Sequence, residues 1–527
     1  MYIQRIKIKG KKKNYFSIIL REAYYDKESK KNKNRTIATL TKWPPELIEA
    51  LELQLKKKKL VALDDLPSSA GKAVGAVFVI NEIAKRLGIT AALGNGRNSK
   101  LALFQIAGRI ITQGSRNYLA NEWKNIQDIN EIFKLEKFNE DSLYRNLDWL
   151  ADNQEEIEKK IFKYRKQEKI KSVYLYDVTS SYFEGDKNEY AEYGYNRDKK
   201  KGKKQMVIGL LTDNEGFPLS VEVFKGNTND LSTVSSQLKK LKENFGVERV
   251  VFVGDRGMVK SVQIEEINSD LYKWNYLTSI TREQIKSLIN KEIIQLELFE
   301  DKLIEVKKDN VRYILRRNPV RANEINENRM NKIEAVLQEI NKKNKYLREH
   351  LRAGVKPAAE KIKEKIDKLG LSKILKLEIK GREIKLETDE ESLSKAKELD
   401  GCYVLKTDVP IEELDKEKAH DRYKDLAKVE SAFRMMKTGL EELRPVYVRK
   451  AKRTRGHVFV VMLAYMIIKE IMDKVKELGY SKKFIFETLD KIQYTEYEYA
   501  GKKLKVLPKK LLISQEEILR KLELKMK

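Results

Sequence analysis

The sequence predicts an α/β protein in which a central sheet is interrupted by a long insertion, and three observations support this prediction. Residues 169–281 alternate between strand-like and helix-like segments, as α/β folds do. Residues 70–168 carry apolar side chains at helical spacing, which predicts a helical domain. Residues 282–400 are dense in Lys and Glu and separate the α/β segments from a further strand and two helices.

The length of the chain predicts several domains. The 527 residues are too many for one hydrophobic core, and a hydrophobic content of 41% suffices for more than one. We expect an N-terminal β-rich module, a helical domain, an α/β core in two parts, an α+β insertion between these parts, and a basic C-terminal tail. In that order, the expected boundaries are 1–66, 67–168, 169–281 with 401–485, 282–400 and 486–527.

The charge balance is strongly positive. The chain has 108 Lys and Arg against 80 Asp and Glu, which gives a formal net charge of +28 and a pI near 9.5. An excess of this size favours a polyanionic partner, because neutralising phosphates releases condensed counterions. The alternative is that many of the lysines only solvate the surface.

Cysteine content and hydropathy argue against a secreted or membrane protein. Cys402 is the only cysteine in the sequence, so neither an intramolecular disulfide nor a zinc site of the CxxC type can form. The N-terminal residues lack the apolar region of a signal peptide. The longest apolar stretch, 458–468, spans 11 residues, whereas crossing a bilayer requires about 18. We expect a cytoplasmic protein with no membrane partner, in which this stretch is a buried helix.

Local patterns predict the elements that precede the core. Residues 1–45 alternate apolar and polar side chains, which predicts a small antiparallel sheet, and a helix is expected over 46–64. Three helical segments are expected between residues 70 and 168. One stretch among them, RLGITAALG, resembles the turn of a helix-turn-helix unit, so DNA reading and an ordinary helical bundle both remain open.

Residues 169–281 predict five strands and two helices. Three strands come first, the second and third joined by an Asn-Glu-Gly turn at 214–216, and then helix, strand, helix and strand follow. This is the element order of a ribonuclease-H-like core. Trp274 and Tyr276 belong to the last strand. Core packing is their expected role, and stacking on a displaced base is the alternative.

The closing part of the core follows the insertion. Residues 282–400 predict long charged helices and a strand pair with Gly381 at its turn. A strand, GCYVLKTD, then precedes a helix from about Lys418 to Leu440 and an apolar helix near 456–477. The α+β insertion is thus expected to interrupt the core before its closing helix.

Two carboxylates stand at the ends of predicted core strands. Val173, Leu175 and Asp177 fall on one face of the first strand, where an acid is costly to bury unless it is paired or bound to a metal. Asp255 follows the continuous apolar run RVVFVG, at the carboxyl end of an interior strand where α/β sheets place their sites. Alone, Asp177 could instead cap a turn, and Asp255 could pair with Arg256.

A third carboxylate lies in the predicted closing helix. Tyr423, Glu430 and Lys437 are spaced by seven residues, nearly two helical turns, and therefore share one helical face. Because any core-facing helix shows this spacing, geometry alone does not single out Glu430.

Three sequence blocks together resemble the metal-ligand blocks of insertion-sequence DDE transposases. They are YDVTSSYFEG, VFVGDRGM and the pattern Y-x6-E-x6-K, in this order and with the long insertion before the last block. The similarity is to the group with the Y-x2-R-x3-E-x6-K signature, and it covers about residues 70–500. In one departure, Leu426 stands at the position of the arginine. The role of that arginine is then either absent or moved, and Lys424, Lys428 or Arg434 could supply the charge.

The resemblance implies a DNA-cutting and DNA-joining enzyme. Asp177, Asp255 and Glu430 would be its catalytic residues and would hold two Mg²⁺ ions, for which Mn²⁺ can substitute. Water would first free a 3′-hydroxyl at the end of the mobile element, and this hydroxyl would then attack target DNA. Both steps would use one site, because both are in-line displacements at phosphorus.

The resemblance also implies that double-stranded DNA is the partner, as terminal inverted repeats and as target. Tyr423 and Lys437 would contact phosphates beside the metals, and Arg434, one turn after Glu430, could add charge. The helical domain 67–168 would bind the DNA end. Pairing two ends suggests a dimer on DNA. The expected location is the cytoplasm of a bacterium or archaeon, near the nucleoid.

Two basic segments are expected to hold DNA. One is VRKAKRTRGH at 448–457, and the other is the loop RDKKKGKKQ at 197–205. The candidate DNA-binding lysines of this loop are Lys199, Lys200, Lys201, Lys203 and Lys204.

Two other functions remain open. A structure-specific nuclease on the same core would cut DNA without joining it. A catalytically inactive derivative would only bind DNA, but the presence of all three carboxylates argues against it.

Overall fold

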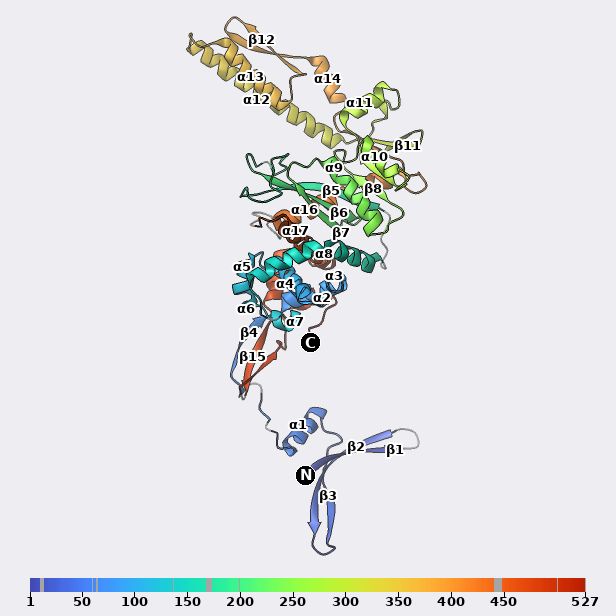
Figure 1. Cartoon of the computed structure of the whole chain (residues 1–527), viewed down its shortest axis with the longest axis vertical. Coiled ribbons are helices and arrows are strands. Elements are labelled where there is room, and N and C mark those ends of the chain that lie inside the picture. Colours follow the sequence, from blue (N-terminus) through green and yellow to red (C-terminus); the bar gives the residue numbers. More distant parts are fainter. Residues whose placement is uncertain are drawn as a thin grey trace. The chain divides into compact units, whose positions relative to one another are not determined.

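The computed structural model describes residues 1–9, 14–58, 60–62, 65–135, 137–166, 173–198, 200–439, 448–499 and 501–526. Its elements are labelled in Figure 1. The chain divides into two compact units: Met1–Ala73 with Ile492–Leu511, and Val74–Lys491 with Leu512–Met526.

The elements with described bounds in the first unit are two three-stranded sheets and the helix α1. The N-terminal sheet is antiparallel with the order β1-β2-β3, as the alternating pattern predicts. Its elements are β1 (Tyr2–Lys9), β2 (Asn14–Asp26) and β3 (Lys31–Thr39), and α1 (Pro45–Leu55) follows. The second sheet has the order β16-β15-β4 and consists of β4 (Ser68–Ala73), β15 (Gln493–Tyr499) and β16 (Lys502–Val506). The segment 486–527, expected as a basic tail, therefore supplies two strands to a sheet.

The second unit begins with a helical domain around α17 (Ala451–Val475). The apolar stretch 458–468 is buried at every position, which confirms the predicted buried helix. Helix α17 packs against α8, α4 and strand β7. The other helical elements are α2 (Gly75–Arg86), α3 (Ile89–Leu93), α4 (Arg97–Ile111), α5 (Arg116–Tyr118), η2 (Leu119–Trp123), α6 (Lys124–Ile126), α7 (Ile129–Phe133), α8 (Glu140–Lys166), η6 (Lys476–Leu478), α18 (Lys482–Asp490) and α19 (Ile513–Lys521). Within the described part of the chain, none of the helices combines the length and apolar character needed to span a membrane.

An eight-stranded mixed sheet forms the α/β part, with the order β10-β11-β14-β9-β8-β5-β6-β7. Strands β5, β6 and β7 are antiparallel neighbours, whereas β8 is parallel to β5 and β9 is parallel to β8. The strands are β5 (Val173–Tyr182), β6 (Gln205–Asp213), β7 (Pro218–Lys225), β8 (Val251–Gly254), β9 (Asn275–Ser279), β10 (Ile304–Lys308), β11 (Val311–Arg317) and β14 (Cys402–Thr407). Gly216, with φ of 73°, forms the expected turn between β6 and β7.

The helices that follow β7 and β8 cover one face of this sheet. They are α9 (Asp230–Lys239) with η3 (Lys240–Asn244), and α10 (Ser261–Asn268). Tyr174, Tyr176 and Val178 of β5 belong to the same buried cluster as Val234 of α9. Because side chains alternate along a strand, Asp177 points to the opposite face. Helix α16 packs against β5.

The insertion differs in part from its prediction. It contains α11 (Arg282–Asn290), η4 (Leu296–Leu298), α12 (Pro319–Glu349), α13 (Val355–Leu369), β12 (Leu375–Lys380), β13 (Glu383–Thr388) and α14 (Glu390–Glu398). Strands β12 and β13 form the expected pair, and α12, α13 and α14 share a buried cluster with them. However, β10 and β11, both within 282–400, extend the main sheet because β11 pairs with β14. Buried Arg312 supports this junction by donating to the carbonyls of Val409 and Leu414.

The expected single closing helix is divided. It consists of α15 (Lys416–Lys424), α16 (Leu426–Arg434) and one π-helical turn, η5 (Met435–Gly439). Asp425 lies between the two α-helices, where its carboxylate pairs with Arg422 and Lys428 at 3.0 and 2.8 Å. The division separates Tyr423, in α15, from Glu430, in α16.

Candidate active site

Asp177, Asp255 and Glu430 line one pocket with a volume of about 820 Å³. They come from strand β5, the turn after β8 and helix α16, which are far apart in the sequence. The structure thus brings together the three carboxylates that the sequence singles out. The pocket is also lined by Thr179, Arg197, Asp230, Tyr423, Lys424, Leu426, Arg434 and Lys437.

Sheet register and helix packing place these carboxylates. Tyr176 of β5 is paired with Gly254 of β8 in parallel register, so Asp177 and Asp255 follow at equivalent positions on neighbouring strands. Helix α16 buries Leu426, Val429 and Phe433. Glu430 lies on its exposed face, which is the arrangement of an amphipathic helix over a sheet.

The electrostatic environment of Asp177 disfavours its ionised form. Burial raises the pKa of the Asp177 carboxyl from 3.8 to about 7, and the nearby charges of Asp255 and Glu430 add to this rise. The Val178 N–H, which donates to Oδ1 of Asp177 at 2.8 Å, and the Arg197 charge lower the pKa in part. No ion pair joins Asp177 to a basic residue in the described ranges.

Asp255 is held by two donors. The Tyr423 hydroxyl donates to Oδ1 of Asp255 at 3.0 Å, and the Arg256 N–H donates to the same oxygen at 2.7 Å. The Tyr423 oxygen also lies 2.7 Å from the Ser279 hydroxyl. Burial, together with the charge of Asp255, raises the pKa of the Tyr423 hydroxyl, so tyrosine remains a neutral donor.

The chemistry of the pocket fits a divalent cation, although its side chains are not closed around a common point. Among the residues that the structure describes, no three Asp, Glu, His or Cys side chains form a ready-made metal site. Glu430, however, has no hydrogen bond or ion pair with any described residue, and the pKa of Asp177 is raised. Three carboxylates that repel one another present the oxygen ligands that Mg²⁺ prefers. Binding would require these side chains to turn toward a shared ion.

The residues expected to contact phosphates differ in their exposure and in their ion pairs. Lys437 forms an ion pair with Asp198 at 3.1 Å, and both side chains are at most 10% exposed. Arg434 is exposed and lines the pocket. Leu426 is 8% exposed and packs at the start of α16. Of the substitutes for the missing arginine, Lys428 is engaged by Asp425 and by the Asn214 carbonyl. Lys424 and Arg434 line the pocket.

The lysine-rich loop does not contribute its described lysines to the pocket lining. Lys203 pairs with Glu184 at 2.7 Å. Lys200 and Lys204 lie 5.7 Å from the ring centroids of Tyr182 and Tyr193, respectively. Lys201 is exposed, and Lys199 lies outside the described residues. Contact of this loop with DNA stays a prediction.

The second basic segment, 448–457, runs into helix α17, and two of its cations connect this helix to α8. Lys452 pairs with Asp152 at 2.6 Å, and Arg453 pairs with Asp148 at 3.2 Å. These two side chains therefore have a structural role in the helical domain, which the sequence pattern does not indicate.

Trp274 and Tyr276 are core residues. They are 2% and 1% exposed and belong to the buried cluster under α9 and α10. The expected packing role is confirmed, and stacking on a base would require their exposure.

Two residues of the pocket were not expected from the sequence. Arg197 and Asp230 pair at 2.5 Å beside Asp177. Asp230 follows the helix-capping residue Asn229 at the start of α9, so its sequence context indicates only a favourable charge at a helix N-terminus. Arg197 begins the basic loop 197–205, whose sequence pattern does not distinguish it from the neighbouring lysines.

Comparison with known proteins gives one family. The family model described as "Transposase DDE domain" matches residues 168–467, more than half of the chain and a range that includes all three carboxylates. No curated protein matches the sequence. Among solved structures, the chain is similar to a piggyBac transposase in a cryo-EM synaptic complex with hairpin DNA, with 10% identity and a TM-score of 0.36. That similarity covers 78% of this chain and 77% of the other.

Proposed function

Because the chain belongs to the transposase DDE domain family, we propose that it is a DNA transposase whose catalytic residues are Asp177, Asp255 and Glu430. One observation carries this proposal: three carboxylates from separate segments line the same pocket, without basic partners that would neutralise Asp177 or Glu430 within the described residues. A pocket that gathers several carboxylates and raises the pKa of one of them is typical of catalytic sites.

We propose that the three carboxylates hold two Mg²⁺ ions, for which Mn²⁺ can substitute. When bound, such ions supply an activated nucleophile and stabilise the leaving oxygen of a phosphodiester. The residues of the chain would position the metal ligands and the DNA. Tyr423 would fix the rotamer of Asp255, Asp177 would have to be deprotonated, and Lys424 and Arg434 would face the DNA phosphates.

The proposed reaction is cut-and-paste transposition. Hydrolysis frees a 3′-hydroxyl at the element end, and this hydroxyl then displaces a 3′-oxygen in target DNA. The helical domain would bind the element ends, and two copies of the chain would pair them.

Two finer assignments belong to the same proposal. The strand order β7-β6-β5-β8-β9, with one antiparallel meander and two parallel strands, supports a ribonuclease-H-like core. The positions of Tyr423, Glu430 and Lys437 support the Y-x2-R-x3-E-x6-K group, in a branch with Leu426 in place of arginine.

Incubation of the full chain with Mg²⁺, DNA carrying both element ends, and a supercoiled target plasmid tests the proposal. The unmodified chain should cut the ends and join them to the plasmid. Asp177→Asn, Asp255→Asn and Glu430→Gln should each lower the cutting rate at least about a thousandfold and retain end binding. Glu156→Gln, at an exposed position of α8, serves as the control.

The outcomes separate the possible functions. A carboxylate variant that cuts at the unmodified rate would remove that residue from the site. Cutting without joining would identify a nuclease, and end binding without cutting by the unmodified chain would identify an inactive derivative.

A further inference from the structure

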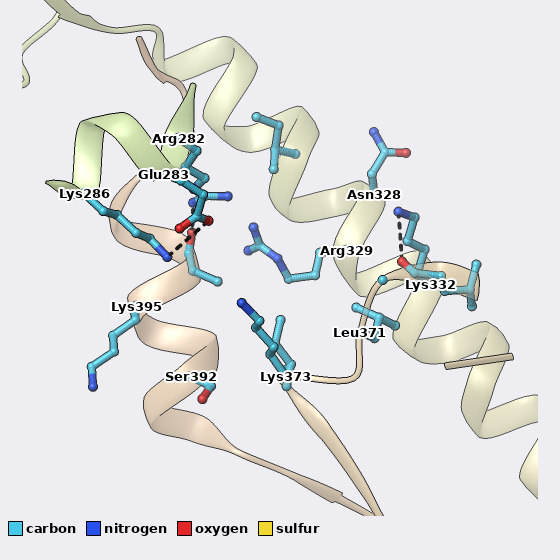
Figure 2. A pocket seen from close by; sticks show the side chains of 15 residues that line it. Arg282, Glu283, Lys286, Asn328, Arg329, Lys332, Leu371, Lys373, Ser392 and Lys395 are labelled. Carbon is cyan, nitrogen blue, oxygen red and sulfur yellow. Dashed lines mark hydrogen bonds and ion pairs between the residues drawn. The ribbon is translucent and has the colours of Figure 1, made fainter. Parts of the chain in front are cut away.

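A second pocket, of about 790 Å³, lies in the insertion and shares no lining residue with the first. It is formed by α11, α12, the end of α13, the segment before β12, and α14 (Figure 2). Among its described lining residues, Glu283 is the single acid. The basic residues that line it are Arg282, Lys286, Arg329, Lys332, Lys373 and Lys395.

Arg329 is the most unusual of these basic residues because it is 8% exposed and only partly hydrogen bonded. Its Nη2 donates to Oδ1 of Asp400 at 2.7 Å. Its Nη1 is buried and has no hydrogen-bond partner among the described residues. A buried guanidinium N–H without an acceptor is unfavourable, so a ligand oxygen at this position would be stabilising.

The described acids around the pocket neutralise its positive charge only in part. Asp400 is 2% exposed and accepts from both Arg329 and Arg282, the latter at 3.3 Å, so one carboxylate serves two guanidinium groups. Lys373 is exposed and has no ion pair with a described residue. In Figure 2, Arg329 and Lys373 extend toward the middle of the pocket from its two sides.

The remaining lysines are engaged in weaker or local contacts. Lys286 lies 4.0 Å from Glu283, and Lys332 lies 3.4 Å from the Leu369 carbonyl. Lys395 pairs with Glu391, one turn earlier on α14. These contacts leave Arg329 and Lys373 as the groups that can receive an anion.

We propose that this pocket binds a phosphate group, and that its source is the backbone of the transposed DNA. A guanidinium fixed at one nitrogen by Asp400 offers the other to a phosphate oxygen in a preset direction, and a lysine opposite adds a point charge. The volume is larger than one phosphate needs, which leaves room for the adjoining sugars of a polymer. The choice of DNA rests on the proposed function, whereas the phosphate chemistry rests on Arg329, Lys373 and Asp400.

Binding by the full chain carrying Glu430→Gln tests this inference without DNA cleavage. In this background, Arg329→Lys retains the positive charge but loses the two terminal nitrogens of the guanidinium. Lys373→Gln removes an exposed charge. Lys342→Gln is the matched control, because Lys342 is an exposed lysine on the same helix, thirteen residues or about 20 Å from Arg329. The probes are a fluorescent element-end duplex and inorganic pyrophosphate, and thermal melting verifies folding.

Arg329→Lys and Lys373→Gln should each weaken duplex binding by about three- to tenfold. Lys373→Gln should also lower the slope of log K against log salt concentration by about one. Lys342→Gln should change neither quantity. Because Lys373 is exposed, its variant should fold even if Arg329→Lys does not.

Two results would change the inference. If the duplex binds all variants equally but Arg329→Lys abolishes the thermal stabilisation by pyrophosphate, the pocket takes free phosphate compounds and the DNA source is wrong. If neither probe distinguishes the two variants from Lys342→Gln, the phosphate site itself is wrong. A chain with Glu430 intact that fails to cut DNA would instead contradict the proposed function.

Discussion

The Tyr423 hydroxyl donates a hydrogen bond to Oδ1 of Asp255 across 3.0 Å. The Arg256 N–H donates to the same oxygen, and Oδ2 of Asp255 has no hydrogen bond from a described residue. The tyrosine expected to contact DNA therefore also holds a proposed metal ligand. This arrangement makes Tyr423 a positioning residue for Asp255.

Replacement of Tyr423 by Phe should weaken metal binding. Loss of one hydrogen bond to a charged group costs about 1.5–3 kcal/mol, so the cutting rate should fall roughly tenfold or more. The Mg²⁺ concentration for half-maximal rate should rise. The measurement is the cutting rate as a function of Mg²⁺ concentration. Tyr346→Phe, at an exposed position of α12, is the control. An unchanged Mg²⁺ dependence would show that Tyr423 does not position Asp255.

Asp177→Asn should stabilise the metal-free protein at neutral pH. Because the folded-state pKa is about 7 and the ordinary value is 3.8, the carboxyl is neutral in both states only at low pH. Its stabilising contribution is lost as pH rises from about 4 to about 7, since the carboxyl then ionises readily in the unfolded state but stays protonated in the folded state. The variant's advantage should grow between about pH 4 and 7 and stay constant above. A shift from 3.8 to about 7 is worth at most about 4 kcal/mol.

Thermal melting of both proteins in EDTA from pH 5 to 8 measures this effect, which should reach several degrees. Addition of Mg²⁺ should raise the melting temperature of the unmodified protein more than that of Asp177→Asn. If the unmodified protein and Asp177→Asn melt at the same temperature at pH 8, both in EDTA and in Mg²⁺, the result would argue against a buried, metal-binding Asp177.

Glu158→Ala should destabilise the contact between helix α8 and the sheet. Glu158 is 1% exposed, and its carboxylate accepts from Ser220 at 2.8 Å and from Gln154 at 2.7 Å. Burial raises the pKa of the Glu158 carboxyl. Truncation leaves the buried Ser220 hydroxyl without this acceptor, and the half-buried Gln154 amide keeps only the Val221 carbonyl, at a cost of about 2–4 kcal/mol. Urea unfolding measures the loss. Glu156→Ala, at an exposed ion pair with Lys160, should change stability by less than about 0.5 kcal/mol.

Loss of charge from the lysine-rich loop should reduce the salt dependence of DNA binding. Lys200 and Lys201 are exposed, and each phosphate contact contributes about 0.9 to the slope of log K against log salt concentration. Lys200→Gln with Lys201→Gln should lower this slope by about two in a filter-binding titration. The control pair is Lys342→Gln with Lys363→Gln, two exposed lysines of the insertion. Equal slopes for both pairs would exclude the loop from the DNA interface.

Local patterns predicted much of the fold. The alternation of apolar and polar residues gives the β1-β2-β3 sheet, and the continuous apolar runs give β8 and α17. Polar residues that interrupt apolar patterns also indicated Asp177 and Asp255. Asp255 directly follows β8 as expected, whereas Asp177 lies in the middle of β5 and not at the end of that strand. Glu430 depended on family resemblance, since its helical spacing is shared by ordinary core-facing residues.

Features that depend on long-range pairing could not be predicted. Strands β10 and β11 join the main sheet only because β11 pairs with β14, almost 90 residues later in the chain. The ion pairs of Lys437 with Asp198 and of Arg329 with Asp400 likewise join segments that no local pattern connects. The division of the closing helix at Asp425 is also invisible in its helical periodicity.

Titration of Mn²⁺ into the full chain, followed by electron paramagnetic resonance, tests most directly whether Asp177, Asp255 and Glu430 form one metal site. The unmodified protein should bind two ions, and Asp177→Asn, Asp255→Asn and Glu430→Gln should each lose at least one, whereas Glu156→Gln should bind both. Mn²⁺ binding by all three carboxylate variants with the stoichiometry and affinity of the unmodified protein would contradict a shared site.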